Sequence, residues 1–151
     1  MDLNLLKLFG TEFDLYNITN IVRGKFWNLN EQSLHDLLVS HISGNSDELL
    51  SKMISAENLK SSFMELSKTK FSEIIPSEAD DIVMMNEFDR KSDLFLYNSL
   101  LREFTNMFKL STVVSVVRLY DYGIINLSSI SYAVENTISS NIVVSKIITS
   151  E

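Results

Sequence analysis

Apolar residues recur every three or four positions along most of the 151-residue chain, which is the pattern of amphipathic α-helices. The clearest stripe lies in segment 14–27 and consists of Leu15, Ile18, Val22 and Phe26. Only 4 glycines and 1 proline interrupt the chain, and so few helix breakers favour long helices over tight hairpins. The pattern therefore predicts an all-α fold, a bundle of helices.

Local signals predict where the helices begin and end. A first short helix is expected from Asp2 to Phe9, with Gly10 as its C-terminal cap. Asn30 is expected to cap a helix that continues through Ile42. Further helices are expected over 46–54, 56–66, from Ser77 onwards, 94–108, 112–136 and after a cap at Ser139. The charged residues 89–93 predict a break or an exposed turn of helix.

Segment 112–136 has two competing interpretations. Its valines, at positions 113, 114, 116 and 117, are β-branched and favour a strand. Tyr120, Ile124, Leu127, Ile130 and Val134 keep the three-and-four spacing of a helix, so we predict a helix. Pro76 is the clearest stop in the chain and is expected to separate two helical units, residues 1–76 and 77–151, which pack together.

A shift of about 109 residues lays one part of the chain over another. Asn17–Ile21 (NITNI) falls on Asn126–Ile130 (NLSSI), and the expected helix cap at Asn30 falls on Ser139. Apolar positions match over roughly thirty residues, although two unrelated amphipathic helices can also match by chance. The shared break and cap favour an internal repeat of a helix-break-helix unit. Duplicated helical units without catalytic groups are typical of scaffolds and adaptors.

The charge and composition of the chain exclude several classes of partner and site. The net charge is −7, and no basic stripe is present that would bind nucleic acid. No run reaches the ~18 apolar residues of a membrane-spanning helix, and the N-terminus does not read as a signal peptide. The chain has no cysteine, so disulfides and thiolate metal sites are excluded, which fits a reducing compartment. We expect a cytoplasmic protein.

No catalytic constellation is apparent in the sequence. The four glycines are isolated, so no phosphate-binding loop is present, and no Gly-x-Ser-x-Gly motif occurs. His35 and His41 lie six residues apart, on different faces of a helix, which does not suit a helical metal site. Asp80 and Asp81 are better explained as charges at a helix N-terminus than as a catalytic pair. We expect no enzyme activity, no cofactor and no metal.

Six residues are the candidate partner or inter-helix contacts. They are Tyr16, Asn17, Arg23, Lys25, Trp27 and Asn126. Arg23 and Lys25 point about 200° apart around a helix, so they are expected to contact different neighbours instead of gripping one anion. Tyr16, Arg23 and Trp27 share a helix face. They form either a buried stacking and ion-pair group, which we favour, or an exposed partner surface.

The segment Phe13–Leu29, F-D-x-x-N-I-x-x-I-x-R-G-K-x-W-x-L, resembles the repeated motif of the C/d subunit family of V/A-type rotary ATPases. Leu66–Ile75 and Val113–Ile130 are similar to two further segments of that family. The second copy departs from the motif: Gly123 stands where the family usually has Glu, and Tyr132 and Val134 replace Arg and Lys.

The resemblance implies a mechanical function. Members of that family are funnels of helical domains that sit on the membrane rotor ring and receive the central shaft. The resemblance thus implies a non-catalytic central-stalk connector, which transmits torque for proton or sodium transport and is held at the membrane by partner subunits. The chain has under half of that family's usual length, as expected for a fragment or a short relative. A generic helical adaptor is the alternative.

Overall fold

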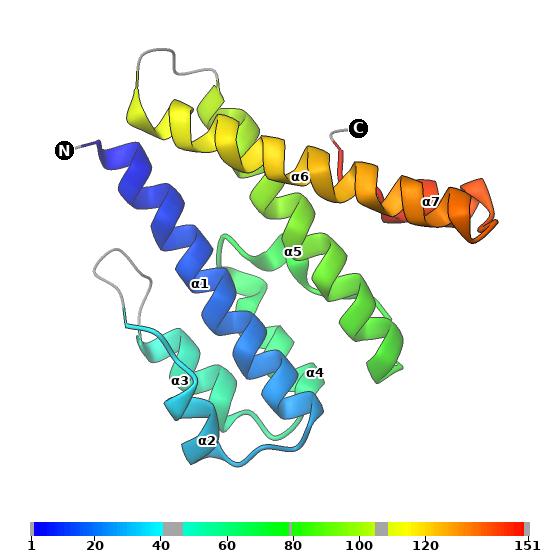
Figure 1. The fold of residues 1–151 in the computed structure, drawn as a ribbon. Coiled ribbons are helices and arrows are strands. Elements are labelled where there is room, and N and C mark those ends of the chain that lie inside the picture. Colours follow the sequence, from blue (N-terminus) through cyan, green and yellow to red (C-terminus); the bar gives the residue numbers. More distant parts are fainter. Residues whose placement is uncertain (1, 41–46, 79, 105–108, 150–151) are drawn as a thin grey trace. The chain divides into compact units, whose positions relative to one another are not determined.

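The computed structural model describes residues 2–40, 47–78, 80–104 and 109–149, and within these ranges the chain forms helices and no strand (Figure 1). The α-helices are α1 (Leu3–Phe26), α2 (Glu31–Asp36), α3 (Asp47–Ser55), α4 (Leu59–Met64), α5 (Asp81–Phe104), α6 (Leu110–Glu135) and α7 (Ser140–Lys146). Two 3-10 helices, η1 (Glu65–Lys68) and η2 (Ser72–Ile74), follow α4. The predicted all-α fold is confirmed. Among the described helices, none is long and apolar enough to cross a membrane.

The chain divides into two compact units. We call residues 6–92 the N-terminal unit and residues 1–5 together with 93–151 the C-terminal unit. The boundary between these compact units lies inside α5, because the first half of α5 packs into the N-terminal unit. The rings of Phe88 and Phe63 lie 5.2 Å apart. That residues 1–76 and 77–151 each form a helical unit stays a prediction.

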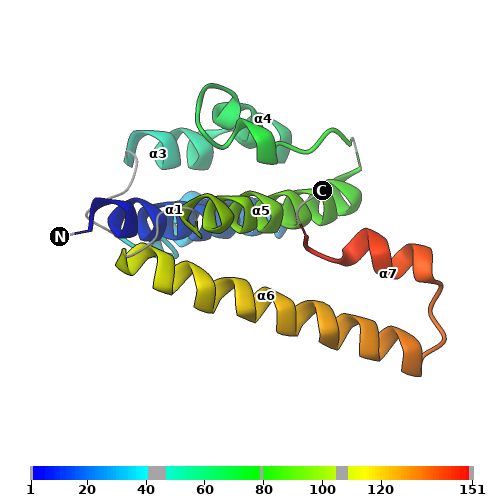
Figure 2. The same ribbon diagram turned by 90° about the horizontal axis from the view of Figure 1, so that it is seen from above.

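The N-terminal unit contains most of the buried apolar side chains. Figure 2 shows α3 and α4 on one side of α1, and α3 also packs against α2 and η1. The fully buried side chains come from every helix of the unit. The largest are Phe63, Phe71, Phe88, Ile18, Ile21, Leu34, Met53, Ile54, Leu66 and Ile74. Burial of these apolar side chains stabilises the unit.

The C-terminal unit is built around α6. Figure 2 shows α7 folding back beside the last turns of α6, and the two helices are in contact. Tyr122 of α6 meets Tyr97 of α5 edge-on, with ring centroids 5.5 Å apart. The carboxylate of Asp2 accepts a hydrogen bond from the backbone N–H of Ser111 at 3.0 Å, which ties the N-terminus to the start of α6. That bond is the main cause of the lowered pKa of Asp2.

Two predicted helix limits are wrong. Gly10 does not end a helix: α1 continues through it, with no glycine of the described chain at positive φ. The helix capped by Asn30 ends at Asp36 instead of near Ile42. Of the two alternatives for the charged residues 89–93, the structure shows a partly exposed turn of helix within α5, where Lys91 pairs with Glu87 one turn earlier at 2.8 Å and donates to the carbonyl of Ile75 at 2.7 Å.

Other predicted limits are confirmed. The strand alternative for 112–136 is wrong, since α6 is one helix over this segment. Asp80 does act at a helix N-terminus: its side chain accepts from the N–H groups of Ile82 and Val83, at 3.1 Å each. Ser139 occupies the N-cap position of α7, although its side chain makes no capping bond. The predictions that involve His41, Ile42, Gly44 and Phe108 lie outside the described residues.

Candidate partner-binding surfaces

The first copy of the repeat ends α1 with a tight turn. The N–H of Leu29 donates to the carbonyl of Gly24 at 2.9 Å, and the N–H of Asn28 donates to the carbonyl of Lys25 at 2.9 Å. Asn28 has φ 56°, in the left-handed region. This pair of bonds is a Schellman motif, which satisfies the last carbonyls of the helix and turns the chain sharply. Asn30 then caps α2 by accepting from the N–H of Ser33 at 2.9 Å.

The second copy makes the same turn 109 residues later. Ile138 donates to the carbonyl of Ala133 at 2.9 Å, and Thr137 donates to the carbonyl of Val134 at 3.3 Å. Thr137 has φ 53°, like Asn28, and these two are the only non-glycine residues of the described chain with positive φ. Each bond joins residues that correspond under one shift, so the two segments share a backbone design.

An asparagine clamp fixes the tail that follows each turn. The side chain of Asn17 donates to the carbonyl of Val39 at 2.9 Å and accepts from the N–H of the same residue at 2.8 Å. Asn126 makes the same two bonds to Ile148, at 2.7 Å and 3.0 Å. Both clamps span 22 residues. They explain why α2 is short: the chain leaves the helix so that Val39 can reach Asn17. The predicted internal repeat is confirmed by these matched bonds.

One pair of packing residues differs between the two copies in a way that keeps the total side-chain volume nearly constant. Gly24 lies so close to Leu34 that a Cβ at position 24 would collide with the Leu34 side chain. The corresponding pair in the second copy is Ala133 and Val143. There the first side chain gains one carbon atom and the second loses one. Nearly constant volume is what two closely packed helices require.

Arg23 and Lys25 contact different neighbours, as predicted. The Arg23 guanidinium forms an ion pair with Asp89 at 3.2 Å. The Lys25 ammonium donates to the carbonyls of Ile54 and Ala56, at 2.8 Å and 2.6 Å, and so caps the C-terminus of α3. Partial burial lowers the pKa of Lys25, and the nearby carboxylate of Glu31 opposes that effect.

The favoured interpretation of Tyr16 and Trp27 is wrong. These rings do not form a buried group with Arg23, because Tyr16 is 53% exposed and Trp27 is 66% exposed. The N-terminal unit buries the opposite stripe of α1 instead, with Ile18 and Val22 fully covered. Tyr16 and Trp27 therefore belong to the surface, and the alternative, an exposed face with aromatic side chains, is the one that the structure supports.

One ion pair inside the N-terminal unit was not predicted from the sequence. Asp14 is almost fully buried, at 3% exposure, and pairs with the ammonium of Lys70 at 3.2 Å. Lys70 also donates to the hydroxyl of Thr11 at 3.0 Å. The pair joins α1 to the segment between η1 and η2. Its counterpart in the second copy is missing, since Gly123 stands at the position of Asp14.

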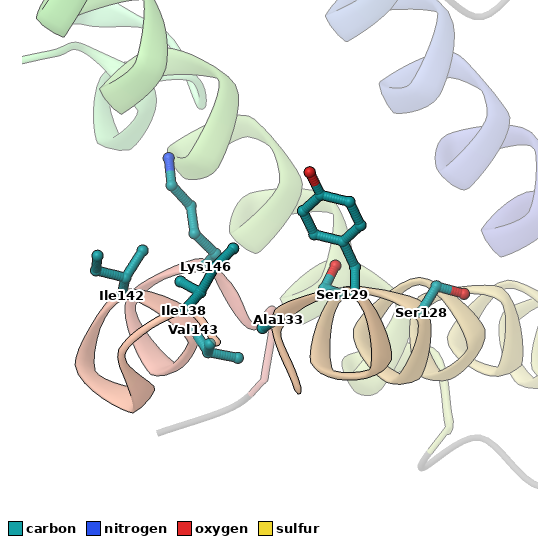
Figure 3. Close-up of a pocket in the computed structure, with 8 residues that line it drawn as sticks. Ser128, Ser129, Ala133, Ile138, Ile142, Val143 and Lys146 are labelled. Carbon is teal, nitrogen blue, oxygen red and sulfur yellow. The ribbon is translucent and has the colours of Figure 1, made fainter. Parts of the chain in front are cut away.

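A pocket of about 500 Å³ lies between the end of α6 and α7 (Figure 3). Apolar side chains from both helices form most of its wall, among them Ala133, Ile138, Ile142 and Val143. The polar side chains that line it are Ser128, Ser129, Tyr132 and Lys146, and the apolar surface of the pocket exceeds the polar surface. The pocket is consequently better suited to an apolar side chain of a partner than to a reacting substrate.

The second copy also exposes much of its apolar surface. Ile124, Leu127 and Ile130 are 50%, 66% and 38% exposed, whereas their first-copy counterparts Leu15, Ile18 and Ile21 are at most 6% exposed. In the part of the chain that the structure describes, no group of three or more His, Asp or Glu side chains could hold a metal ion. His35 is exposed. An exposed apolar surface of this kind is typical of a site that binds another protein.

Comparison with known proteins identifies the family. The family model of the ATP synthase (C/AC39) subunit matches residues 2–144, which covers both copies of the repeat. No curated protein and no solved structure gives a significant match. The match includes the resembling segments Phe13–Leu29, Leu66–Ile75 and Val113–Ile130. Because the matched segment spans nearly the whole chain, the protein belongs to the ATP synthase (C/AC39) subunit family.

Proposed function

We propose that the chain is a non-catalytic connector in the central stalk of a V/A-type rotary ATPase. It would link the membrane rotor ring to the central shaft, transmit torque for proton or sodium transport, and be held on the cytoplasmic side through partner subunits. The observation that carries this proposal is the family match over residues 2–144. The repeated, clamped helical unit inside that match is suited to a mechanical part.

The clamps suit a part that must not yield under load. A helix–helix turn held only by a flexible loop would bend when force is applied to one of its arms. Here the Schellman bonds fix the turn, and the Asn17 and Asn126 side chains bind the tails back to the helices that precede them. Each buried hydrogen bond of this kind contributes about 1 kcal/mol, and several must break together before the unit opens.

The candidate contact residues take two roles in this proposal. Asn17, Arg23, Lys25 and Asn126 hold elements of the chain together. The exposed rings of Tyr16 and Trp27 are proposed to contact a partner subunit, since large aromatic side chains are frequent anchors in interfaces.

Co-purification tests the proposal. The full chain, tagged and isolated under gentle conditions from cells that make a V/A-type ATPase, is expected to bring down rotor-ring and shaft subunits. Replacing Tyr16 and Trp27 together by Ala is expected to reduce that recovery several-fold. Met64→Ala is the matched control, because Met64 is 57% exposed in the same unit and has no proposed role. Recovery of neither ring nor shaft subunits would contradict the proposal.

A helical adaptor that works outside a rotary ATPase is the second candidate. The exposed apolar surface of α6 favours it, because such a surface suits binding to helices of many proteins. The two candidates differ in what co-purifies with the chain. An adaptor would bring down a reproducible partner while the rotor-ring and shaft subunits stay behind.

A further inference from the structure

The exposed apolar residues of α6 follow a stricter pattern than an ordinary amphipathic helix. Residues spaced alternately four and three apart form one line along the helix, which we call the α6 seam: Val113, Val117, Tyr120, Ile124, Leu127, Ser131 and Val134. The apolar members are between 50% and 74% exposed. The seam therefore runs for three heptads along α6 as an open apolar line.

This spacing is the one that packs a helix against another helix. Alternating steps of four and three average 3.5 residues per turn, so the line stays in register with a single neighbouring helix. A helix that only covers a domain core follows the broader 3.6-residue stripe instead. Along the seam, Val117, Ile124 and Ser131 take the a positions, while Val113, Tyr120, Leu127 and Val134 take the d positions.

The described elements of the C-terminal unit contact α6 on its other side. Tyr122 meets Tyr97 of α5, Asn126 clamps Ile148, and Ala133 is buried beside α7. These three positions lie about 100° or more around the helix from the middle of the seam. The contacts that these elements make with α6 therefore leave the seam exposed.

Residues of the first copy that correspond to part of the seam are buried. Shifted back by 109 residues, Val117, Ile124, Leu127 and Ser131 correspond to Leu8, Leu15, Ile18 and Val22. All four are at most 6% exposed, inside a unit built only of helices and their connections in its described part. The other three seam positions correspond to the polar residues Asn4, Thr11 and Lys25. Four of the seven seam positions are therefore packed against helices in the first copy.

The flanks of the seam indicate what the covering helix carries. Asp121 and Glu135 lie along one flank, and both are exposed. The ion pair of Asp121 with Arg118 is long, at 4.0 Å, and its Asp121 side chain is 54% exposed. Val116, Gly123 and Ile130 form an uncharged flank on the other side. A helix with basic residues facing the acidic flank would match both sides.

Two features argue against another copy of this chain as the occupant. Two α6 helices packed antiparallel would set the acidic flank of one against that of the other, and two packed parallel would set each acidic flank against an uncharged flank with no basic partner. The covering segment of the N-terminal unit, in turn, depends on Asp14 and Lys25, which pair with Lys70 and with the carbonyl groups that end α3. In the second copy these anchors are Gly123 and Val134, so a swapped α3–η2 segment would lose both.

From these observations we infer that the α6 seam binds an amphipathic α-helix of a partner protein, about three heptads long, with Lys or Arg along one flank. Gly123 assists this contact, because a Cβ placed there would meet no atom within 4 Å and the backbone is open to close approach. The inference does not depend on the rotary-ATPase proposal, since it rests on the spacing, exposure and charge of α6 alone.

A designed probe tests the inference. The probe is a three-heptad helical peptide with Ile and Leu at its a and d positions and Lys on one flank. A second peptide carries Glu in place of those Lys residues. The chain has no cysteine, so an environment-sensitive dye can be attached at a single Leu127→Cys on the seam or at Ile125→Cys off the seam. The Lys peptide is expected to shift the dye emission at 127 and leave it unchanged at 125.

Matched variants decide whether the seam is responsible. Leu127→Glu is expected to weaken binding of the Lys peptide at least tenfold, whereas Ile125→Glu, which changes a 52% exposed residue of the same helix, is expected to stay within twofold. The Glu peptide should bind at least tenfold more weakly than the Lys peptide at low salt, and this difference should shrink as salt is added.

Four results would overturn the inference. They are no binding of the Lys peptide, equal binding to Leu127→Glu and Ile125→Glu, equal binding of the two peptides, and sedimentation of the chain as a dimer that Leu127→Glu dissociates. The last would assign the seam to a second copy. A fifth such result would be hydrogen exchange at residues 124–131 of the isolated monomer as slow as that at residues 15–22, because the seam would then be covered by the chain itself.

Discussion

The two copies of the repeat have the same backbone bonds and opposite surroundings. Both end a helix in a Schellman turn, place a residue at positive φ, and clamp a tail 22 residues away with an asparagine. The first copy then buries its apolar stripe, while the second leaves the same stripe exposed. The comparison shows that the turn and clamp do not require a covered stripe. They form a self-contained local design.

The two copies differ in the charged residues that hold covering segments against the helix. Asp14 and Lys25 in the first copy pair with Lys70 and with the carbonyls of Ile54 and Ala56, all of which belong to covering segments. In the second copy, Gly123 and Val134 take these positions. On an exposed helix without a covering segment, a charged side chain at these positions would have no partner to pair with and would add little to stability. The residues that anchor a cover are therefore absent where the described chain has no cover.

The largest expected effect concerns the two clamps. Asn17→Ala removes two hydrogen bonds from a residue that is only 1% exposed, and is expected to lower the free energy of unfolding by about 2–3 kcal/mol. Asn126→Ala removes the same bonds from a partly exposed residue and should cost about 1 kcal/mol. Urea unfolding followed by circular dichroism measures both. Equal losses would mean that covering does not strengthen the clamp.

The next effect concerns the packing pair Gly24 and Leu34. Gly24→Ala places a methyl group against the Leu34 side chain and is expected to cost about 1–3 kcal/mol. Adding Leu34→Val copies the second-copy pair of Ala133 and Val143, and should recover more than half of the loss. The double variant is compared with each single one in a thermodynamic cycle. Additive losses would show that the two positions do not share one packing volume.

A titration then tests an ion pair of the N-terminal unit, which contains the first copy. Glu87 belongs to α5, where the hydrogen bond from Lys91 lowers its pKa from 4.5 to about 2. Because its folded pKa is depressed, Glu87 stabilises the unit above about pH 4.5, and this contribution is lost as the pH falls towards 2. Glu87→Gln should cost about 1–2 kcal/mol at pH 7 and close to nothing at pH 2.

The readout for that titration is the fluorescence of Trp27, the only tryptophan, which lies in the first copy. Glu78→Gln serves as the control, because the side chain of Glu78 is exposed and only its backbone contacts Glu87. A loss of stability in Glu87→Gln that stays the same from pH 7 to pH 2 would exclude the ion pair as its cause.

The smallest effect concerns the left-handed residues. Thr137 is β-branched and has φ 53°, a conformation that β-branched side chains rarely adopt. Thr137→Gly is expected to stabilise the chain by about 0.5–1 kcal/mol. Asn28→Gly should change little, since Asn tolerates this conformation. Thermal unfolding of the two variants measures the difference. A loss of stability in Thr137→Gly would show that its side chain has a role beyond the turn.

The sequence predicted what periodicity can reveal. The all-α fold, the single helix over 112–136, the caps at Asn30 and Asp80, and the shift of 109 residues are confirmed because each rests on local spacing. The end predicted at Gly10 was wrong, because a glycine permits a helix stop without requiring one. Burial of Tyr16 and Trp27 was wrong because a helix with two apolar faces does not show which of them is covered.

The clamps were missed although a signal existed. Asn17 and Asn126 lie 22 residues before Val39 and Ile148, and the shift of 109 relates both pairs. Matching polar residues in a repeat point to a shared tertiary role, but helix periodicity does not show which backbone they reach. The buried pair of Asp14 with Lys70 gave no such signal, because its second copy is missing. Contacts between segments that are distant in the sequence can be identified only once the fold is known.

Hydrogen exchange of the unmodified chain tests the central claim most directly. The claim is that one clamped unit occurs twice, covered in the first copy and bare in the second. The amides of Val39 and Ile148 should both be protected by their asparagine partners. The helix amides at 15–22 should exchange at least tenfold more slowly than those at 124–131, as expected for a covered helix beside an exposed one. Unprotected Val39 and Ile148 amides, or equal exchange of the two helices, would contradict the account.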